Sequence, residues 1–514
     1  MSARHQKDKD ILLALQQVNP NTHITMQDIR NEKKRITKEF LGGRTKTEAL
    51  VDLLMEEDGD WSVSWDKNSE TERLNRLFFA HYRGIALAHN YPEVLLIDAT
   101  YRTNIYNIPL LHFAGVTPTS KTFSIGFAFM ASESAAMYQW VLSQFQSHTH
   151  GDQLIPTIII TDSDGALLLA LSAIFPDTPH LLCRWHAEKN VLKQANECWR
   201  ITGVSEAEKK KNTELRDQFM ERWQEVVRAK TEEAFEDLYA KLKNDYSEQV
   251  NLLAYLDEYK YSKKELFAAA WSNQLKHYGV TVTSRIEGAH SCLKALLNSS
   301  RNDLLDVVKV IESLHLTQYS EIRANLATQR ERIPYDINAK FNKWMEPGIN
   351  TKIVPKALRL AKQQYELSQS EKYNNSCSKS FEKSMGIPCC YTIKDLLSLD
   401  LKVIESHFDT YWLFRRPPAP VPVESDFDPA PHVLTNRQID PIAYLPLQQG
   451  LLGTNNIDPL LQNELALPAV LPPVVIRSKG RPRNSDRSTR REPSAWEHNR
   501  GARSSGVSTT LSRS

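Results

Sequence analysis

Short apolar runs separated by polar turns dominate the chain between positions 93 and 183. Buried strands are predicted by three of these runs, "EVLLIDAT", "IPLLHFAGVT" and "TFSIGFAFMAS". A helical stretch follows, and then a strand, a polar turn and a helix are predicted by "PTIIITDSDGALLLALSAIF". A fifth short strand that runs into another helix is predicted by "HLLCRW". This order of strands and helices is typical of a mixed α/β sheet flanked by helices.

The periodicity changes after this stretch. Between positions 184 and 280 the chain contains no proline, and large apolar residues recur at helical spacing. The pattern predicts an all-helical block of several helices. The residues at this spacing are Phe219, Trp223, Val226, Val227, Phe235, Leu238, Tyr239 and Leu242.

Two more helices are predicted between positions 24 and 57. Thr25 with Asp28, and Thr45 with Glu48, have the spacing of capping boxes, and the pair Gly42-Gly43 ends the first helix. A helix-turn-helix that contacts DNA is one interpretation. An ordinary helical hairpin is favoured, because nothing in the pattern marks a recognition face.

Composition is that of a globular chain with two or three domains: 514 residues, 41% hydrophobic and 25% charged. No run approaches the roughly 18 apolar residues of a membrane span, so no membrane partner is expected. Six scattered cysteines favour a reducing, intracellular compartment. The net charge of +2 is uneven, because residues 477–514 hold ten Lys or Arg and three Asp or Glu. This basic tail on a slightly acidic body favours a polyanionic partner.

Two aspartates follow apolar strands. Asp98 comes directly after Val94–Ile97, and Asp162 comes after "PTIIIT". Ligands bind beyond the carboxyl ends of strands in open α/β sheets, and two carboxylates placed there repel each other unless a cation lies between them. Both are therefore candidate ligands of Mg²⁺, which prefers oxygen. Taken singly, each is better explained as a cap, and Asp164 is the clearer cap, for a helix that begins at Gly165.

A third acid, Glu287, lies in "VTSRIEGAHSCLK", close to Arg285 and His290. Thr283 and Ser284 are typical of a helix start, so Glu287 falls in the first turn or two of that helix. Spacing alone favours a solvated glutamate that interacts with the helix dipole.

Four ordered segments resemble the Mutator-like element (MULE) transposase family. The family's first aspartate block is matched by "LIDATYRTN" with "PLLHFAGVT", and its second by "IIITDSDGALLLAL". Its Cys-x-x-His signature is matched by "LLCRWHAEKNVL", and its glutamate block by "TSRIEGAH". The resemblance covers roughly residues 90 to 300. It implies an RNase H-like mixed sheet flanked by helices, with a large all-helical insertion before the third acidic residue.

The resemblance implies that Asp98, Asp162 and Glu287 form a catalytic triad that holds Mg²⁺ or Mn²⁺. Two such ions would clamp the attacking and leaving oxygens of a phosphodiester, so the implied reaction is cleavage and transfer of double-stranded DNA, in the nucleus, without a small-molecule substrate. Cys183 and His186, the signature pair, are expected to be structural residues near the active site or DNA contacts, with packing alone as an equal alternative. The alternative function is that of a catalytically inactive, domesticated DNA-binding regulator. A homodimer is a further possibility that the sequence leaves open.

The segment "NNSCSKSFEKSMGIPCCYTI" resembles the SWIM zinc finger that often follows this domain. Cys377 and Cys389 occupy two ligand positions of that motif, but Asn375 and Tyr391 stand at the other two. Tetrahedral zinc usually needs four ligands, so we expect a degenerate finger without tight zinc binding. Cys390 and His407 are open substitutes.

The basic tail contains a segment that resembles an AT-hook, with Gly480-Arg481-Pro482 flanked by Lys479 and Arg483. Such a segment fits the narrow minor groove of A·T-rich DNA; a nuclear-import or merely solvated tail is the alternative. The expected regions are then an N-terminal helical region (1–90), the transposase domain (91–300, insertion about 190–280), a helical region (301–372), the degenerate finger (373–414), a linker (415–476) and a disordered basic tail (477–514).

Overall fold

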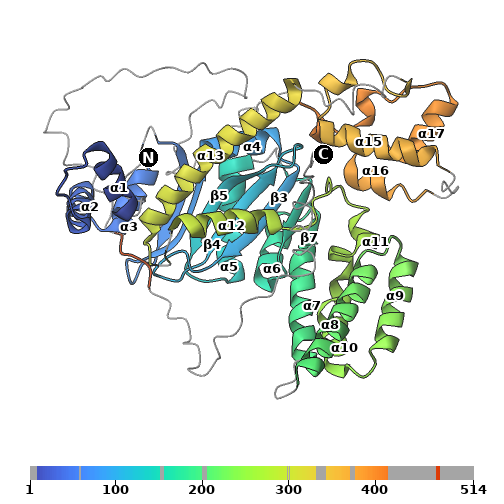
Figure 1. Ribbon diagram of the computed structural model, residues 1–514, viewed down its shortest axis with the longest axis horizontal. Coiled ribbons are helices and arrows are strands. Elements are labelled where there is room, and N and C mark those ends of the chain that lie inside the picture. Colours follow the sequence, from blue (N-terminus) through green and yellow to red (C-terminus); the bar gives the residue numbers. More distant parts are fainter. Residues whose placement is uncertain are drawn as a thin grey trace, which may run out of the picture. The chain divides into compact units, whose positions relative to one another are not determined.

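The structure is a computed structural model, and it describes residues 8–56, 59–150, 155–199, 205–297, 299, 301–331, 343–370, 377–414 and 470–474. Within these residues, seven strands form one sheet in the order β1-β2-β5-β4-β3-β6-β7 (Figure 1). The strands are β1 (Trp61–Lys67), β2 (Leu74–His81), β3 (Val94–Thr100), β4 (Leu110–Val116), β5 (Thr122–Met130), β6 (Ile158–Thr161) and β7 (His180–Leu182). β3 pairs antiparallel with β4 and parallel with β6, so the mixed α/β sheet predicted from the sequence is confirmed.

β1 and β2 extend the sheet beyond β5, because β2 pairs antiparallel with both β1 and β5. They lie in residues 1–90, where only helices are predicted above, and that prediction is wrong for these two strands. The sequence of β1, "WSVSWDK", alternates apolar and polar residues, which is the pattern of a strand with one covered face. The sheet therefore begins before residue 91.

Helices cover both faces of the sheet. Successive side chains of a strand point to opposite faces, so Leu95 and Ile97 of β3 pack on one side and Val94, Leu96 and Asp98 face the other. The first face carries α4 (Tyr82–Asn90), α5 (Ala135–Phe145) and α6 (Gly165–Ile174). The second carries α12 (Ser284–Leu297) and the first half of α13 (Leu304–Glu331), which cross the strands (Figure 1), while Ile322 in the second half of α13 joins the core of the first face.

The chain between β7 and α12 forms a helical block, as predicted. Its helices are α7 (Arg184–Cys198), α8 (Glu206–Val227), α9 (Glu232–Asp245), α10 (Val250–Tyr259), the 3-10 helix η2 (Tyr261–Leu266) and α11 (Ala269–Ser272). Phe219, Trp223 and Phe235 are buried in its core, and Leu182 of β7 joins the same core. The block is thus anchored on the edge strand of the sheet. None of the helices in the described part of the chain combines the length and apolar character that crossing a membrane requires.

Before the sheet, the described residues form α1 (Asp8–Val18), α2 (Met26–Leu41) and α3 (Lys46–Leu54). The predicted pair of helices is confirmed by α2 and α3. Thr25 and Thr45 accept the backbone N–H of Asp28 and Glu48, whose carboxylates accept the threonine N–H in return. Both capping boxes therefore form as their spacing predicts. Gly42 ends α2 in the left-handed conformation, with φ of 53°.

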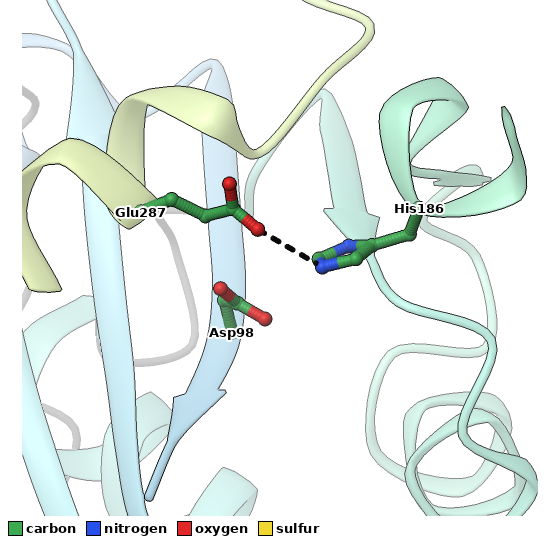
Figure 2. Close-up of side chains that lie close together, drawn as sticks. All are labelled: Asp98, His186 and Glu287. Carbon is green, nitrogen blue, oxygen red and sulfur yellow. Dashed lines mark ion pairs between the residues drawn. The ribbon is translucent and has the colours of Figure 1, made fainter. Parts of the chain in front are cut away.

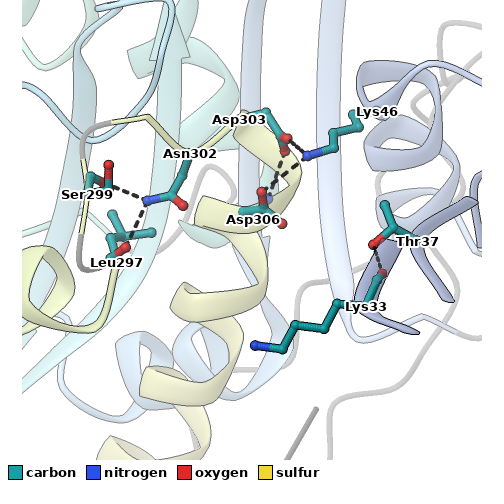
Figure 3. Close-up of polar contacts among 8 residues, drawn as sticks. All are labelled: Lys33, Thr37, Lys46, Leu297, Ser299, Asn302, Asp303 and Asp306. Carbon is teal, nitrogen blue, oxygen red and sulfur yellow. Dashed lines mark hydrogen bonds and ion pairs between the residues drawn. The ribbon is translucent and has the colours of Figure 1, made fainter. Parts of the chain in front are cut away.

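α3 is attached to the start of α13 by a buried charge (Figure 3). The ammonium of Lys46 binds the carboxylate of Asp303, which is 6% exposed, and lies 3.4 Å from Asp306 Oδ2. The loop that follows β3 reaches the same place, because the Ile105 N–H donates to the Asn302 carbonyl at 2.8 Å. The N-terminal helices, the loop after β3 and the turn between α12 and α13 are therefore joined at one point.

We expect Lys46→Met to lower the free energy of unfolding by about 1–3 kcal/mol, because it leaves the Asp303 carboxylate buried without its cation. Urea unfolding followed by circular dichroism measures this change. Lys38→Met, at an exposed position of α2, is the matched control and should change stability by less than about 0.5 kcal/mol. Equal effects of the two substitutions would show that the Lys46 contact does not anchor α3.

Residues 343–414 share an apolar core with the second sheet face. This core joins side chains of β3, β4 and β6 to those of the C-terminal helices. The helices are η4 (Ile349–Thr351), α15 (Pro355–Ser368), α16 (Ser380–Met385), α17 (Cys390–Ser398), η5 (Glu405–His407) and η6 (Thr410–Trp412). Trp412 is fully buried and donates its Nε1–H to the Met385 carbonyl at 2.6 Å, and the Tyr411 hydroxyl donates to the Val116 carbonyl at 3.1 Å. The segment that resembles a finger is thus packed onto the sheet.

The cysteines of this segment lie close together. The Sγ atoms of Cys377 and Cys389 are 3.8 Å apart. Gly386 ends α16 with φ of 62°, and a Cβ atom there would lie 2.5 Å from the Asp409 side chain, so glycine is required. His407 Nδ1 accepts the backbone N–H of Ile404. Within the described residues no third ligand atom gathers with the two thiols, and the absence of tight zinc binding stays a prediction.

Two predicted segments fall largely outside the described residues. Lys479, Gly480, Arg481, Pro482 and Arg483, the AT-hook-like residues, lie outside them, as does most of the predicted linker. The end of that linker is described and packs on the folded unit. Val470 is buried, and Leu471 forms a parallel bridge with Arg73. Residues 470–474 are therefore not part of a free linker, because the Val470 side chain is buried and the backbone of Leu471 pairs with that of Arg73.

Candidate metal centre

Asp98 lies inside a strand rather than after one. β3 continues to Thr100, so the Asp98 carboxylate projects from the sheet face that α12 covers and is buried. In the neighbouring parallel strand β6, Ile160 lies opposite Leu96. Asp162 and Asp98 each come two residues later, so the pairing of β3 with β6 places the two aspartates at the same edge, as expected from the sequence.

Glu287 comes from the first turn of α12, as its neighbours Thr283 and Ser284 predict. The Cys-x-x-His segment holds this helix start in place. Cys183 Sγ accepts the Thr283 N–H at 3.1 Å, and the Arg184 N–H donates to the Thr281 carbonyl at 3.1 Å. Cys183 is itself buried at the start of α7. These contacts support a structural role for Cys183, which links the second aspartate strand to the glutamate helix.

His186 lies between the acidic side chains. Its Nε2 is 3.2 Å from Glu287 Oε1 (Figure 2), and its Nδ1 is 3.9 Å from Asp162 Oδ1. Asp98, His186 and Glu287 each place one ligand atom within 4.8 Å of the other two. The structure thus brings together the three acids and the signature histidine, although Asp162 reaches the group across the imidazole and its side chain is 44% exposed.

The stretch from β3 to α7 matches a known family. Residues 94–190 match the MULE transposase domain. Asp98, Asp162, Cys183 and His186 lie inside the matched residues, whereas Glu287 lies outside them. The RNase H-like fold expected for such a domain agrees in class with the mixed sheet described above.

Three curated relatives share between 23% and 29% of their aligned residues with this chain. The PKS-NRPS hybrid synthetase cheA of Chaetomium globosum is 23% identical over 468 residues, which are 84% of this chain and 10% of that protein. Protein FAR1-RELATED SEQUENCE 5 of Arabidopsis thaliana is 26% identical over 178 residues, 34% of this chain and 21% of that protein. Protein FAR-RED IMPAIRED RESPONSE 1 of the same plant is 29% identical over 123 residues, 24% of this chain and 15% of that protein. The chain therefore spans about a fifth or less of each of these relatives.

Burial and mutual charge shift the pKa values of the groups in this cluster. Burial raises the pKa of Asp98 to about 7; His186 opposes this shift, while Glu287 and Asp162 add to it. Burial also disfavours a charged His186, but hydrogen bonds with Cys183 and Glu287 and the charge of Asp162 outweigh burial and raise the pKa of His186 to about 10. At neutral pH, an imidazolium therefore compensates the carboxylates.

The donor set suits a divalent cation. Asp98, Glu287 and the adjacent Asp162 offer carboxylate oxygens, the ligands that Mg²⁺ and Mn²⁺ prefer. Burial is the main cause of the raised pKa of Asp98, and repulsion from Glu287 and Asp162 adds to it; a bound cation would offset both. His186 can join as a ligand only after it releases its proton, since a metal binds neutral imidazole. Otherwise it must turn aside and leave the carboxylates to the metal.

Sequence patterns alone assigned no role to two histidines, His290 and His112, that lie beside Asp98. His290 Nδ1 lies 3.6 Å from Asp98 Oδ2, and His112 lies behind it, 3.3 Å away between ring nitrogens. The available signal was that His290 follows Glu287 by three residues, so both share one helix face.

The cap predicted at Asp164 forms, since its carboxylate accepts the Leu167 N–H at 2.8 Å.

Proposed function

We propose that this chain is a transposase-derived DNA-binding protein that cleaves and joins DNA strands with divalent cations held by Asp98, Asp162 and Glu287. The observation that carries the proposal is that Asp98 of β3 and Glu287 of α12 lie with His186 in one group of ligand atoms, while Asp162, after β6, faces the same imidazole at 3.9 Å. The match of residues 94–190 to the MULE transposase domain supports the same chemistry. A purely structural cluster would not need two carboxylates beside a buried third one.

The cations, when bound, would activate water or a DNA 3′-hydroxyl and stabilise the leaving oxygen of the phosphodiester. The protein's part is to hold charge in fixed positions. Asp98 is anchored in a central strand and Glu287 on a helix that packs across it, so the two carboxylates keep their separation. His186 lies where it can hold a proton near the reacting phosphate, because its ring contacts Glu287 and faces Asp162.

Positive charge for the DNA backbone lies beside the acids. Lys294 lies two turns after Glu287 on α12. Burial and the charge of Arg102 lower its pKa, while the charges of Asp98 and Glu287 raise it, so Lys294 lies near the acidic cluster. Lys260 of the helical block is 5% exposed and senses the charge of Asp162. Lys294, whose side chain is exposed, is suited to contact a phosphate that flanks the scissile bond, whereas the buried Lys260 can only add positive potential near Asp162. The AT-hook-like tail would add a tether to A·T-rich DNA, and the site of action is the nucleus.

The test is cleavage of labelled duplex DNA by the purified full-length protein with Mn²⁺ or Mg²⁺, next to Asp162→Asn. Asparagine keeps the oxygen that accepts the Ser163 N–H, so the local fold should survive. We expect metal-dependent products from the wild type and none from the variant, with equal DNA binding in a gel-shift assay. Identical results for the two proteins, with or without products, would refute catalysis at this site.

A second function is favoured by one observation. The place between the carboxylates is taken by His186, which already compensates their charge, as expected of a fold retained only as a DNA-binding scaffold. The incomplete cysteine motif and the similarity to FAR1-related proteins agree with such a domesticated protein. In that case the protein would bind DNA in the gel-shift assay without any metal-dependent product.

His186→Ala is expected to lower the rate of metal-dependent cleavage by about 10–100-fold, because the variant loses the group that contacts Glu287 and faces Asp162. Single-turnover cleavage at saturating Mn²⁺ measures the effect. His180→Ala on β7, a half-buried histidine outside the cluster, is the control and should change the rate by less than about threefold. If both variants behave alike, His186 serves packing only.

A further inference from the structure

A buried row of polar side chains leads away from the acidic cluster. It crosses the sheet from Ser124 on β5 to His112 on β4, then to His290 on α12 and finally to Asp98 on β3. Ser124 Oγ lies 3.0 Å from His112 Nε2, and His112 Nδ1 lies 3.3 Å from His290 Nε2. His290 Nδ1 faces Asp98 Oδ2 at 3.6 Å. All four residues are less than a tenth exposed.

The hydrogen bonds of this row can be arranged so that every donor leads toward Asp98. Each neutral imidazole carries one N–H, and a contact between two ring nitrogens requires one donor and one acceptor. If the Ser124 hydroxyl donates to His112, then His112 donates from Nδ1 to His290, and His290 keeps its own Nδ1–H for Asp98. The reverse direction would turn a lone pair of His290 toward the Asp98 carboxylate, which is repulsive when that carboxylate is ionised.

Packing alone does not account for this row. A second buried pair, His81 and His315, stacks with ring centroids 5.3 Å apart, yet both Nε2 atoms lack a hydrogen-bond partner among the described residues. His112 also stacks on an aromatic ring, that of Phe127 at 4.3 Å, but in addition both of its nitrogens have polar partners. Because buried histidines in this protein tolerate unpaired nitrogens, the paired nitrogens of His112 indicate a further role.

We propose that Ser124, His112 and His290 form a one-directional hydrogen-bond chain that ends on Asp98, and that His290 is a positioning residue of the acidic site. His290 lies one turn after Glu287 on the same face of α12. It therefore links the glutamate helix to the aspartate strand and fixes the two carboxylates relative to each other. A shift of less than about 1 Å at the Asp98 oxygen brings the last contact to hydrogen-bond length. The inference concerns the site of the proposed function and rests on it for its effect on cation affinity.

The first measurement is Mn²⁺ affinity of the full-length protein, by electron paramagnetic resonance or titration calorimetry. His290→Leu should weaken Mn²⁺ binding by about 10–100-fold, as loss of a residue that orients a ligand does in other metal sites. His290→Asn retains an N–H donor near the position of Nδ1, so it should stay within about threefold of wild type. Ser124→Ala, at the far end of the row, should lose about two- to fivefold because His112 loses its donor.

His315→Leu is the matched control, since it removes a buried histidine whose Nε2 has no partner among the described residues. It should leave Mn²⁺ affinity within about twofold of wild type. The positioning role is overturned if His290→Leu binds Mn²⁺ as the wild type does, or if the leucine and asparagine variants lose affinity equally. Should the leucine variant not fold, Ser124→Ala and His290→Asn still decide the question.

The second measurement does not depend on a cation. Selective ¹⁵N labelling of histidine, with assignment by substitution, reports which ring nitrogen carries the proton. The proposed direction requires the Nδ1–H tautomer at both His112 and His290, and an Nε2–H tautomer at either residue would overturn it. If the wild type shows these tautomers but binds no Mn²⁺ and cleaves no DNA, the proposed function fails while the chain itself is upheld.

Discussion

Replacing Glu287 with glutamine is expected to lower the rate of metal-dependent DNA cleavage by at least about 10³-fold, a loss of about 4 kcal/mol of transition-state stabilisation. Glutamine matches the size of glutamate and can still contact His186, so helix α12 should keep its place. What is lost is one of the two carboxylates that lie with His186 in the tightest part of the cluster. Single-turnover cleavage across a range of Mn²⁺ concentrations measures the rate and the metal requirement together.

The matched control for Glu287→Gln is Glu321→Gln, which removes an exposed carboxylate from α13 and should leave the rate unchanged. Asp98→Asn provides a second comparison. It should also abolish cleavage, yet the metal-free variant should melt no lower than the wild type, because a buried carboxylate beside two others opposes folding until a cation binds. A loss of less than about tenfold for Glu287→Gln would remove this residue from the catalytic group.

Sequence patterns were sufficient to predict the strands that carry or precede the two aspartates, whereas the grouping of Asp98, Asp162 and Glu287 was implied only by the resemblance to the MULE family. The apolar runs before Asp98 and Asp162 predict buried strands, and their parallel pairing follows from the helix and strands that separate them. The capping boxes at Thr25 and Thr45, and the cap at Asp164, depend only on residues three positions away. Local interactions of this kind are the most predictable, because the chain between the partners is short.

Contacts between distant segments could not be predicted in the same way. The strands β1 and β2 were missed because no tight turn signal joins their runs, although "WSVSWDK" alternates as a strand does. The place of His186 between the acids depends on how α7 meets α12, which is set by the Cys183 contact with Thr283. His112 and His290 are 178 positions apart, and only the crossing of α12 over β4 brings them together.

The place of residues 343–414 also depends on contacts between distant segments, and these contacts lead to a prediction about the stability of the whole fold. A motif that resembles a zinc finger suggests a small independent unit, but its apolar residues share one core with β3, β4 and β6. We expect Trp412→Ala to lower the free energy of unfolding by about 3–5 kcal/mol, because it empties a fully buried position and leaves the Met385 carbonyl without its donor. Urea unfolding, followed by circular dichroism and by limited proteolysis, measures the change.

Tyr411→Phe is the conservative control for Trp412→Ala, since it keeps the ring and removes the hydrogen bond to Val116 of β4, at a cost of about 1 kcal/mol. The decisive point is which part of the chain responds to the tryptophan variant. If 343–414 were an independent finger, proteolysis would attack that segment while the sheet unfolded at its original urea concentration. A shared core requires that the sheet, and with it the strand that carries Asp98, unfolds together with the segment. Loss of the C-terminal unit would then weaken the acidic site without touching any of its side chains.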